Sequence, residues 1–179
     1  MGQYIDMIVT ASRRNRGLAE KLSVGVTQEI FARKPRFETT RGETIVHCNH
    51  PAFVYGHLAL YPARMLGFVG VDASKVAVPA HYPDVFKAGV ECKDDPEGTI
   101  YPEREEILEQ FYRNYDGVFA ELTKLDDAVL LKPHPDEMIR EKYFPTIGNA
   151  LTFMLNNHVM MHLGQISTWR RCFGLPSAM

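Results

Sequence analysis

The sequence predicts an all-α fold, a four-helix bundle with long connections. Four stretches repeat apolar residues at helical spacing, and no stretch alternates apolar and polar residues as a half-buried strand would. Two longer irregular segments separate these stretches. The chain has 179 residues, of which 45% are hydrophobic and 23% are charged, which is enough to bury one core. We therefore expect residues 1–179 to form a single helical-bundle domain.

The first two predicted helices cover residues 4–33 and 50–69. In the first, an apolar residue recurs at every fourth position from Leu18 to Ile30, which is the spacing of one helix face. Pro35 ends that pattern, because a proline cannot continue a helix. The second helix is almost wholly apolar at its start, and the side chain of Asn49 is suited to cap it.

The third and fourth predicted helices cover residues 102–125 and 145–173. Glu103 and two further glutamates lie in the first turn of the third helix, where carboxylates favour the positive end of the helix dipole. Its apolar residues then form one stripe of the width that a bundle core requires. Gly174 ends the fourth helix, as glycine commonly does.

Two long connections join these helices. The first, residues 71–101, is rich in proline, and we expect a short helix near residues 84–87 within it. A loop of that length in a compact domain is often functional, so we expect it to line the site. The second connection covers residues 126–144. Either connection can run the length of the bundle, so the helices need not alternate up and down.

Composition excludes several classes of protein. The net charge of −2 argues against a nucleic-acid-binding protein, which needs a basic face. No stretch approaches the ~20 apolar residues of a membrane span, and the amino terminus lacks the features of a secretory signal. The three cysteines, Cys48, Cys92 and Cys172, are odd in number and far apart, unlike a disulfide framework. We therefore expect a cytoplasmic protein.

Two histidines in the fourth helix are candidate metal ligands. His158 and His162 are four residues apart, so both imidazoles lie on one helix face and can reach one ion. Seven histidines in 179 residues give about 0.2 such pairs by chance, so the spacing alone favours two hydrogen-bonded core histidines. However, both lie on the inward stripe of the helix, where neighbouring imidazoles each need a polar partner. A metal ion would satisfy both.

His57 is the candidate third ligand. It lies in the apolar run AFVYGHLAL of the second helix, where a buried imidazole also needs a partner. One ion bound to residues of two helices would explain all three histidines together.

Two segments resemble the signature segments of the DinB/YfiT-like superfamily, the damage-inducible helical-bundle family rather than the polymerase that shares its name. The segments are NHPAFVYGHLALYPARM and NNHVMMHLGQISTWRRCFGLP. The family pattern is a histidine in a G-H-L context, then H-x-x-x-H-x-G-Q, an arginine and G-L. The matching positions in this sequence are Gly56-His57-Leu58, His158 to Gln165, Arg170 or Arg171, and Gly174-Leu175.

The resemblance implies a four-helix bundle in which His57, His158 and His162 bind one divalent metal ion. Zinc or nickel is expected first, with iron or manganese as alternatives. The sequence does not select among metals, because imidazole accepts zinc, nickel, copper and iron alike. The resemblance also implies a homodimer. Some members of the family use the metal to activate a low-molecular-weight thiol for S-transfer or isomerisation, and others have no assigned reaction.

Three functions remain open from the sequence. Three neutral imidazoles leave a coordination position free, as in catalytic zinc sites. That position can hold a small thiol for S-transfer, or a water molecule for hydrolysis of a small-molecule substrate. The third possibility is a non-catalytic bundle in which the metal is structural or the bundle serves for dimerisation. A fourth ligand, for example a carboxylate from the long loop, would favour that third possibility.

Three other polar residues are candidates for the site. His50 lies seven residues before His57, so it either acts as an acid or base at the pocket mouth or is exposed in the first helical turn, which we favour. Gln165 either orients a histidine ligand or joins two helices. Arg64 either meets an anionic substrate or extends to the surface. His47 has the same two interpretations as His50, on weaker grounds. The remaining expectations are solvated His81 and His134, packing roles for Tyr55 and Tyr61, and core positions for Met160 and Met161.

Overall fold

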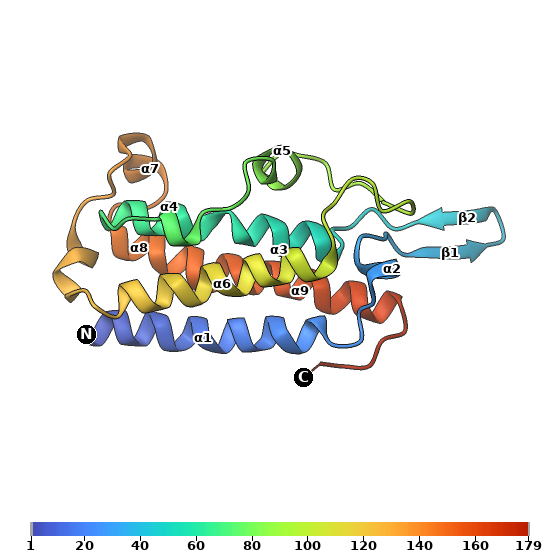
Figure 1. Cartoon of the computed structure of the whole chain (residues 1–179), viewed down its shortest axis with the longest axis horizontal. Helices are drawn as coiled ribbons and strands as arrows, with labels where there is room; N and C mark the ends of the chain where they lie inside the picture. Colours follow the sequence, from blue (N-terminus) through green and yellow to red (C-terminus); the bar gives the residue numbers. More distant parts are fainter. Residues whose placement is uncertain (1, 179) are drawn as a thin grey trace.

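Long helices lie side by side through the computed structural model, which describes residues 2–178 (Figure 1). Contacts join α3 to α6 and α9, α4 to α6, and α1 to both α6 and α9. The fold is therefore predominantly helical, as predicted. In chain order the elements are α1 (Gln3–Ser23), α2 (Gln28–Phe31), β1 (Arg36–Thr39), β2 (Gly42–Ile45), α3 (Pro51–Ala59), α4 (Tyr61–Phe68), η1 (Ser74–Val76), α5 (Tyr82–Phe86), α6 (Arg104–Leu122), η2 (Asp127–Leu131), α7 (Glu137–Lys142), α8 (Ile147–Thr152), η3 (Phe153–Asn157) and α9 (His158–Cys172).

The first helix is shorter than predicted. α1 ends at Ser23, and Gly25 adopts a φ of 73°, in the left-handed region that glycine tolerates. The chain then forms the separate four-residue helix α2. The apolar repeat continues past the break because Val26 and Phe31 still enter the core, where both are buried. The prediction of one helix over residues 4–33 was therefore wrong after Ser23, where the chain leaves the helix.

The second predicted helix is interrupted once. α3 ends at Ala59 and α4 begins at Tyr61, with Pro62 in the first turn of α4. Proline has no N–H to donate to the carbonyl four residues earlier, so the hydrogen-bond ladder restarts here. Every residue of α3 is buried, because this helix is apolar on all sides and is covered by α5, α6 and α9.

A two-stranded antiparallel hairpin, β1 and β2, was not predicted. Its register pairs Arg36 with Ile45 and Thr39 with Gly42, and it projects from one end of the helices (Figure 1). Most of its residues are exposed, so neither face carries the apolar alternation that identifies a half-buried strand. The Arg36 guanidinium lies 2.6 Å from the Glu43 carboxylate across the hairpin and 2.7 Å from the Asp94 carboxylate of the long loop.

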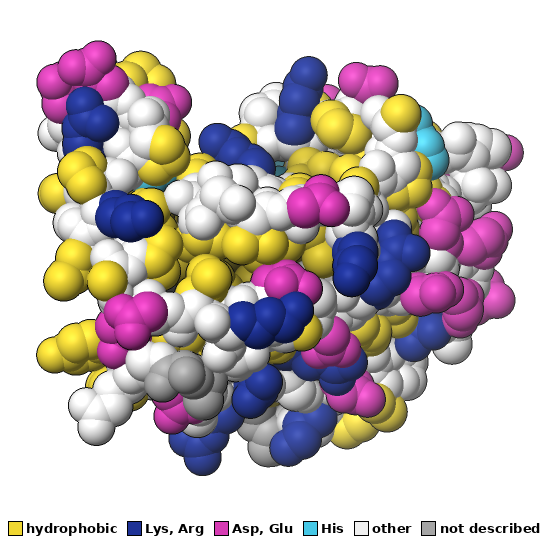
Figure 2. All heavy atoms as spheres, turned by 60° about the vertical axis from the view of Figure 1, so that its left-hand side comes forward, with side chains coloured by type: hydrophobic (Ala, Val, Ile, Leu, Met, Phe, Trp, Pro, Cys, Tyr) yellow, Lys and Arg dark blue, Asp and Glu magenta, His cyan; other side chains and the backbone are white. Residues whose placement is uncertain are grey.

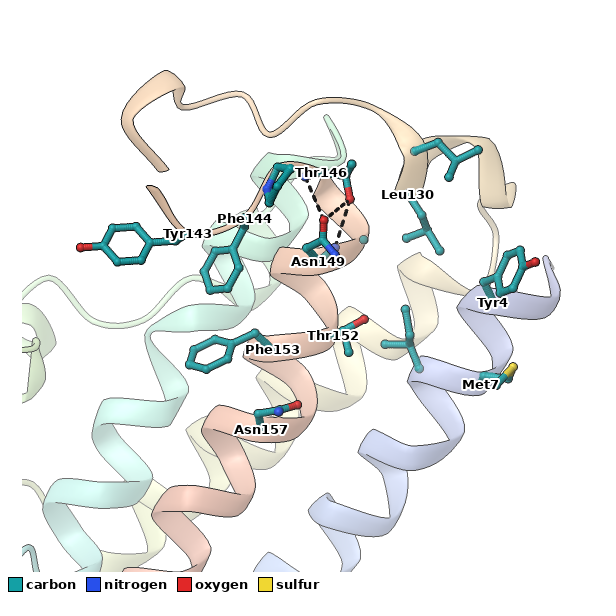
Figure 3. Close-up of a pocket in the computed structure, with 14 residues that line it drawn as sticks. Tyr4, Met7, Leu130, Tyr143, Phe144, Thr146, Asn149, Thr152, Phe153 and Asn157 are labelled. Atoms are coloured by element: carbon teal, nitrogen blue, oxygen red, sulfur yellow. Dashed lines mark hydrogen bonds between the residues drawn. The ribbon is translucent and has the colours of Figure 1, made fainter. Parts of the chain in front are cut away.

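The fourth predicted helix contains a change of helix type. The Thr146 side chain accepts from the backbone N–H of Asn149 while the Asn149 side chain accepts from Thr146 N–H, so a capping box begins α8 (Figure 3). The π-helical turn η3 follows and ends at Asn157, directly before His158. A π turn takes up more residues than an α turn, so it changes which faces the following residues present.

The connections agree partly with the sequence. α6 corresponds to the predicted third helix, and α5 is the short helix expected in the proline-rich loop.

Arg170, one of the two arginines matching the family pattern, is buried and donates to the carbonyls of Leu22, Val24 and Pro176. It therefore ties the end of α9 to the end of α1. No helix between residues 2 and 178 is long and apolar enough to cross a membrane.

Candidate metal centre

Three imidazoles meet between α3 and α9. His57 comes from α3, and His158 and His162 come from consecutive turns of α9. The Nε2 atom of His158 lies 3.4 Å from Nε2 of His57 and 3.1 Å from Nε2 of His162. All three side chains are buried, and one ligand atom from each lies within 4.8 Å of the others. These three histidines could therefore hold one metal ion.

The nitrogen spacing fits a metal ion. A tetrahedral zinc ion with nitrogen ligands at ~2.0–2.1 Å holds those nitrogens about 3.3 Å apart. The two distances to His158 Nε2, 3.1 and 3.4 Å, lie on either side of this value. The donor set therefore suits a divalent ion in its chemistry, and these two spacings match such a site.

Hydrogen bonds fix the tautomers of two of the three rings. The Nδ1 atom of His57 lies 2.7 Å from the carbonyl oxygen of Phe86, and Nδ1 of His162 lies 3.0 Å from Oε1 of Gln165. Both oxygens can only accept, so each Nδ1 carries the proton and donates it. Nε2 of His57 and Nε2 of His162 therefore carry lone pairs, and both atoms lie close to Nε2 of His158, an arrangement that favours a bound cation.

His158 is held by packing instead. Its ring stacks on Phe153 at a centroid distance of 6.0 Å and meets the edge of Tyr61 at 4.6 Å. Its Nδ1 atom is buried and has no hydrogen-bond partner within the described part of the chain. The three candidate ligands are thus oriented differently, two by carbonyl oxygens and one by its aromatic neighbours.

Burial keeps these histidines neutral. The pKa of His57 and of His158 is lowered to about 4, chiefly by loss of solvation and in part by the neighbouring imidazoles, although the hydrogen bond to Phe86 opposes the shift at His57. Burial also lowers the pKa of His162, while the hydrogen bond to Gln165 opposes that shift. Only the neutral form of imidazole is a metal ligand, so the three rings are ready to bind an ion at neutral pH.

Gln165 connects the centre to the loop before α3. Its Oε1 atom accepts from His162 Nδ1 and also from the amide of Asn49, at 3.1 Å. Gln165 thus contacts a candidate ligand, and its second bond reaches the loop before α3, whereas the alternative interpretation expected another helix. Such a partner fixes the ring orientation of a metal-bound histidine.

Tyr61 is a member of the centre that we predicted only as a packing residue. Its hydroxyl lies 3.2 Å from Nε2 of His57. Burial raises the pKa of Tyr61, so the hydroxyl keeps its proton and can donate it in a hydrogen bond. The available sequence signal was its position four residues after His57, which places the two side chains on one face of a continuous helical path.

His50 does not join the three histidines, and its predicted exposure was wrong. It is fully buried at the N-cap of α3, where its Nδ1 accepts from the backbone N–H of Phe53. Its Nε2 donates to the carbonyl oxygen of Lys93 at 2.8 Å. Both ring nitrogens are therefore occupied in structural hydrogen bonds, which leaves neither free to act on a substrate as an acid or base.

Other polar and sulfur-containing residues also differ from expectation. His134 is buried rather than solvated, against the ring of Phe68. Met160 and Met161 are 43% and 54% exposed, so neither fills a core gap. Their neighbours His158 and His162 occupy the inward side of α9, which turns these methionines outward. His47 and His81 are exposed, as expected.

Comparison with known proteins identifies the family. The family model described as DinB superfamily matches residues 8–166, which include all three histidines. The chain belongs to the DinB superfamily. This confirms the family resemblance of the two sequence segments. No curated protein matches this DinB-superfamily chain.

Proposed function

We propose that this DinB-superfamily protein binds one divalent metal ion through the Nε2 atoms of His57, His158 and His162. The convergence of three neutral, buried imidazoles at nitrogen distances of 3.1 and 3.4 Å supports the proposal. Zinc and nickel are the first candidates and iron comes next, because the donor set is all imidazole, and manganese follows because it prefers oxygen ligands.

We further propose that the metal centre is catalytic and acts in thiol-dependent S-transfer or isomerisation. Within the described residues, no cysteine, aspartate or glutamate joins the group of three histidines, so three protein nitrogens leave a position for an outside ligand. A divalent ion there supplies acidification of a bound thiol or water at neutral pH. Gln165 keeps the His162 ring oriented, and the Tyr61 hydroxyl is placed to hydrogen-bond a group held in the centre.

Two alternatives stay open. The same position could hold water, in which case the protein is a metal-dependent hydrolase. A structural ion would instead join α3 to α9, since the ligands come from both helices. The catalytic proposal is favoured by the free position in the donor set, because structural zinc sites are normally closed by four protein ligands.

We infer that residues 1–179 form a single domain of the DinB/YfiT-like type. Its four-helix bundle would consist of α1, α3 with α4, α6, and α8 with α9. We also infer a cytoplasmic location from the free cysteines.

We propose that the protein is a homodimer. An open hollow of about 720 Å³ is lined by exposed apolar side chains such as Tyr4, Met7 and Tyr143 (Figure 3), a surface that a second copy could cover. Sedimentation equilibrium tests this state.

The catalytic proposal is tested with metal-loaded and metal-stripped protein. Loss of free thiol is followed in the presence of several low-molecular-weight thiols and electrophilic acceptors, and ester hydrolysis is followed in parallel. We expect thiol loss that requires the metal and disappears in His158→Ala, whose metal content is measured alongside. Hydrolysis without thiol loss would favour the hydrolase. Isomerisation consumes no thiol, so it is followed by chromatography of the acceptor. Absence of S-transfer, isomerisation and hydrolysis in fully loaded protein would favour the structural role.

A further inference from the structure

A second hollow lies beside the metal centre. It has a volume of about 400 Å³ and lies between α4 and the loop that carries α5. Tyr61 and Arg64 line it from α4, and Val78, Pro83 and Lys87 line it from the loop. Its volume is in the range of small-molecule sites, roughly 300–1,000 Å³. No acidic side chain lines it.

Tyr61 is the residue that this hollow shares with the metal centre. Its ring forms part of the wall of the hollow, and its hydroxyl lies 3.2 Å from the Nε2 atom of His57. The same ring meets the edge of the His158 ring at 4.6 Å. A molecule in the hollow is therefore separated from the candidate ligands by one side chain.

Two positive side chains from different elements border this hollow. Arg64 and Lys87 are both exposed, and neither forms an ion pair with a carboxylate of residues 2–178. The Arg64 guanidinium lies over the Tyr61 ring, 5.9 Å from its centre. Figure 2 shows a hollowed surface between the α5 and α7 segments with basic and apolar side chains beside it. An apolar hollow with two unpaired cations suits a small ligand with a negative group.

We propose that Arg64 and Lys87 bind a carboxylate of the small-molecule substrate and hold its reacting end toward the three histidines. The proposal rests on the proposed function, because it names the substrate class of that site. The planar guanidinium can donate two parallel hydrogen bonds to a carboxylate, while the lysine ammonium adds a second positive charge. Binding from α4 and from the loop together would fix the orientation of the substrate relative to Tyr61.

The test measures binding rather than turnover and uses succinate as the probe. Ligand-observed NMR gives the dissociation constant of succinate, and of its uncharged diamide, for protein stripped of metal. Stripping excludes binding of the carboxylate to the metal itself. The variants are Arg64→Gln and Lys87→Gln, and the matched control is Arg41→Gln, an exposed arginine in the hairpin turn. All three positions are on the surface, so folding should be unaffected.

We expect succinate to bind the metal-free wild type and the diamide not to bind. Each of the two variants should weaken succinate binding about tenfold, the lower end for a charge-assisted hydrogen bond, and the control should match the wild type. No succinate binding to metal-free protein, or equal binding by all variants, would overturn the proposal. Metal uptake by each stripped protein after reloading, measured separately, distinguishes the two ideas. Normal metal uptake without succinate binding contradicts only the carboxylate site, and succinate binding without metal uptake contradicts only the metal centre.

Discussion

His50 should couple the stability of this protein to pH. Its imidazole is fully buried, accepts from Phe53 N–H and donates to the Lys93 carbonyl, an arrangement that requires the neutral ring. Burial lowers its pKa from 6.5 to about 4, although the hydrogen bond to Lys93 opposes the shift. At pH values between these two, the unfolded chain binds a proton at His50 that the folded protein does not bind.

The sign and size of the effect follow from these values. Stability from His50 is fully present above pH 6.5 and is lost as the pH falls from 6.5 toward 4. Each pH unit within that interval costs about 1.4 kcal/mol. Lowering the pH from 7 to 5 should therefore remove about 2 kcal/mol of the free energy of unfolding through His50 alone. That is a large part of the roughly 5–15 kcal/mol of a typical domain.

The assay is urea unfolding at pH 7 and pH 5 in the presence of a chelator, so that metal binding does not contribute. His50→Asn keeps an N-cap acceptor but has no titrating ring. Its loss of stability between the two pH values should be about 2 kcal/mol smaller than that of the wild type. Thr146→Ala, which removes the α8 capping box, is the control: it should lower stability by about 1 kcal/mol at both pH values. Equal losses in the wild type and His50→Asn would refute the reasoning.

Three further predictions concern the centre and its support. Gln165→Leu should weaken metal binding about 10–100-fold because it removes the acceptor from His162, while Gln165→Glu should restore most of the affinity; a chelator competition titration measures both. Tyr61→Phe should retain the metal and leave the visible spectrum of the cobalt-loaded protein nearly unchanged, since the raised pKa of Tyr61 keeps its hydroxyl protonated and a protonated phenol is a poor ligand; a spectrum typical of another coordination number would indicate that Tyr61 binds the metal. Gly56→Ala should cost about 1–3 kcal/mol in urea unfolding because the new Cβ would overlap an aromatic ring, whereas Gly164→Ala has open space and should be neutral or stabilising.

Periodicity located the helices but not all of their ends. α6 follows its predicted range because glutamates occupy its first turn and one apolar stripe runs along the rest of it. The break at Gly25 escaped prediction because the residues after it remain apolar at helical spacing while the backbone leaves the helix. The β1–β2 hairpin escaped because its residues are mostly exposed and carry no alternation.

The sequence likewise identified some residues of the candidate site and missed others. His57, His158 and His162 could be selected from the sequence because a motif and an i,i+4 spacing identify them, and they do lie together. Lys87 could not be selected, since its approach to α4 depends on the path of an irregular loop. His50 was misjudged because its burial comes from the Lys93 segment, which is distant in sequence and covers the start of α3.

The metal content of the purified protein tests the central claim most directly. It would be measured by mass spectrometry on protein without a histidine tag, beside His57→Ala, His158→Ala and, as a control, the exposed His81→Ala. We predict about one equivalent of divalent metal in the wild type and in the control, and its loss in both ligand variants. A wild-type protein that contains no metal and takes up none on reconstitution, or ligand variants that keep it, would contradict the three-histidine centre.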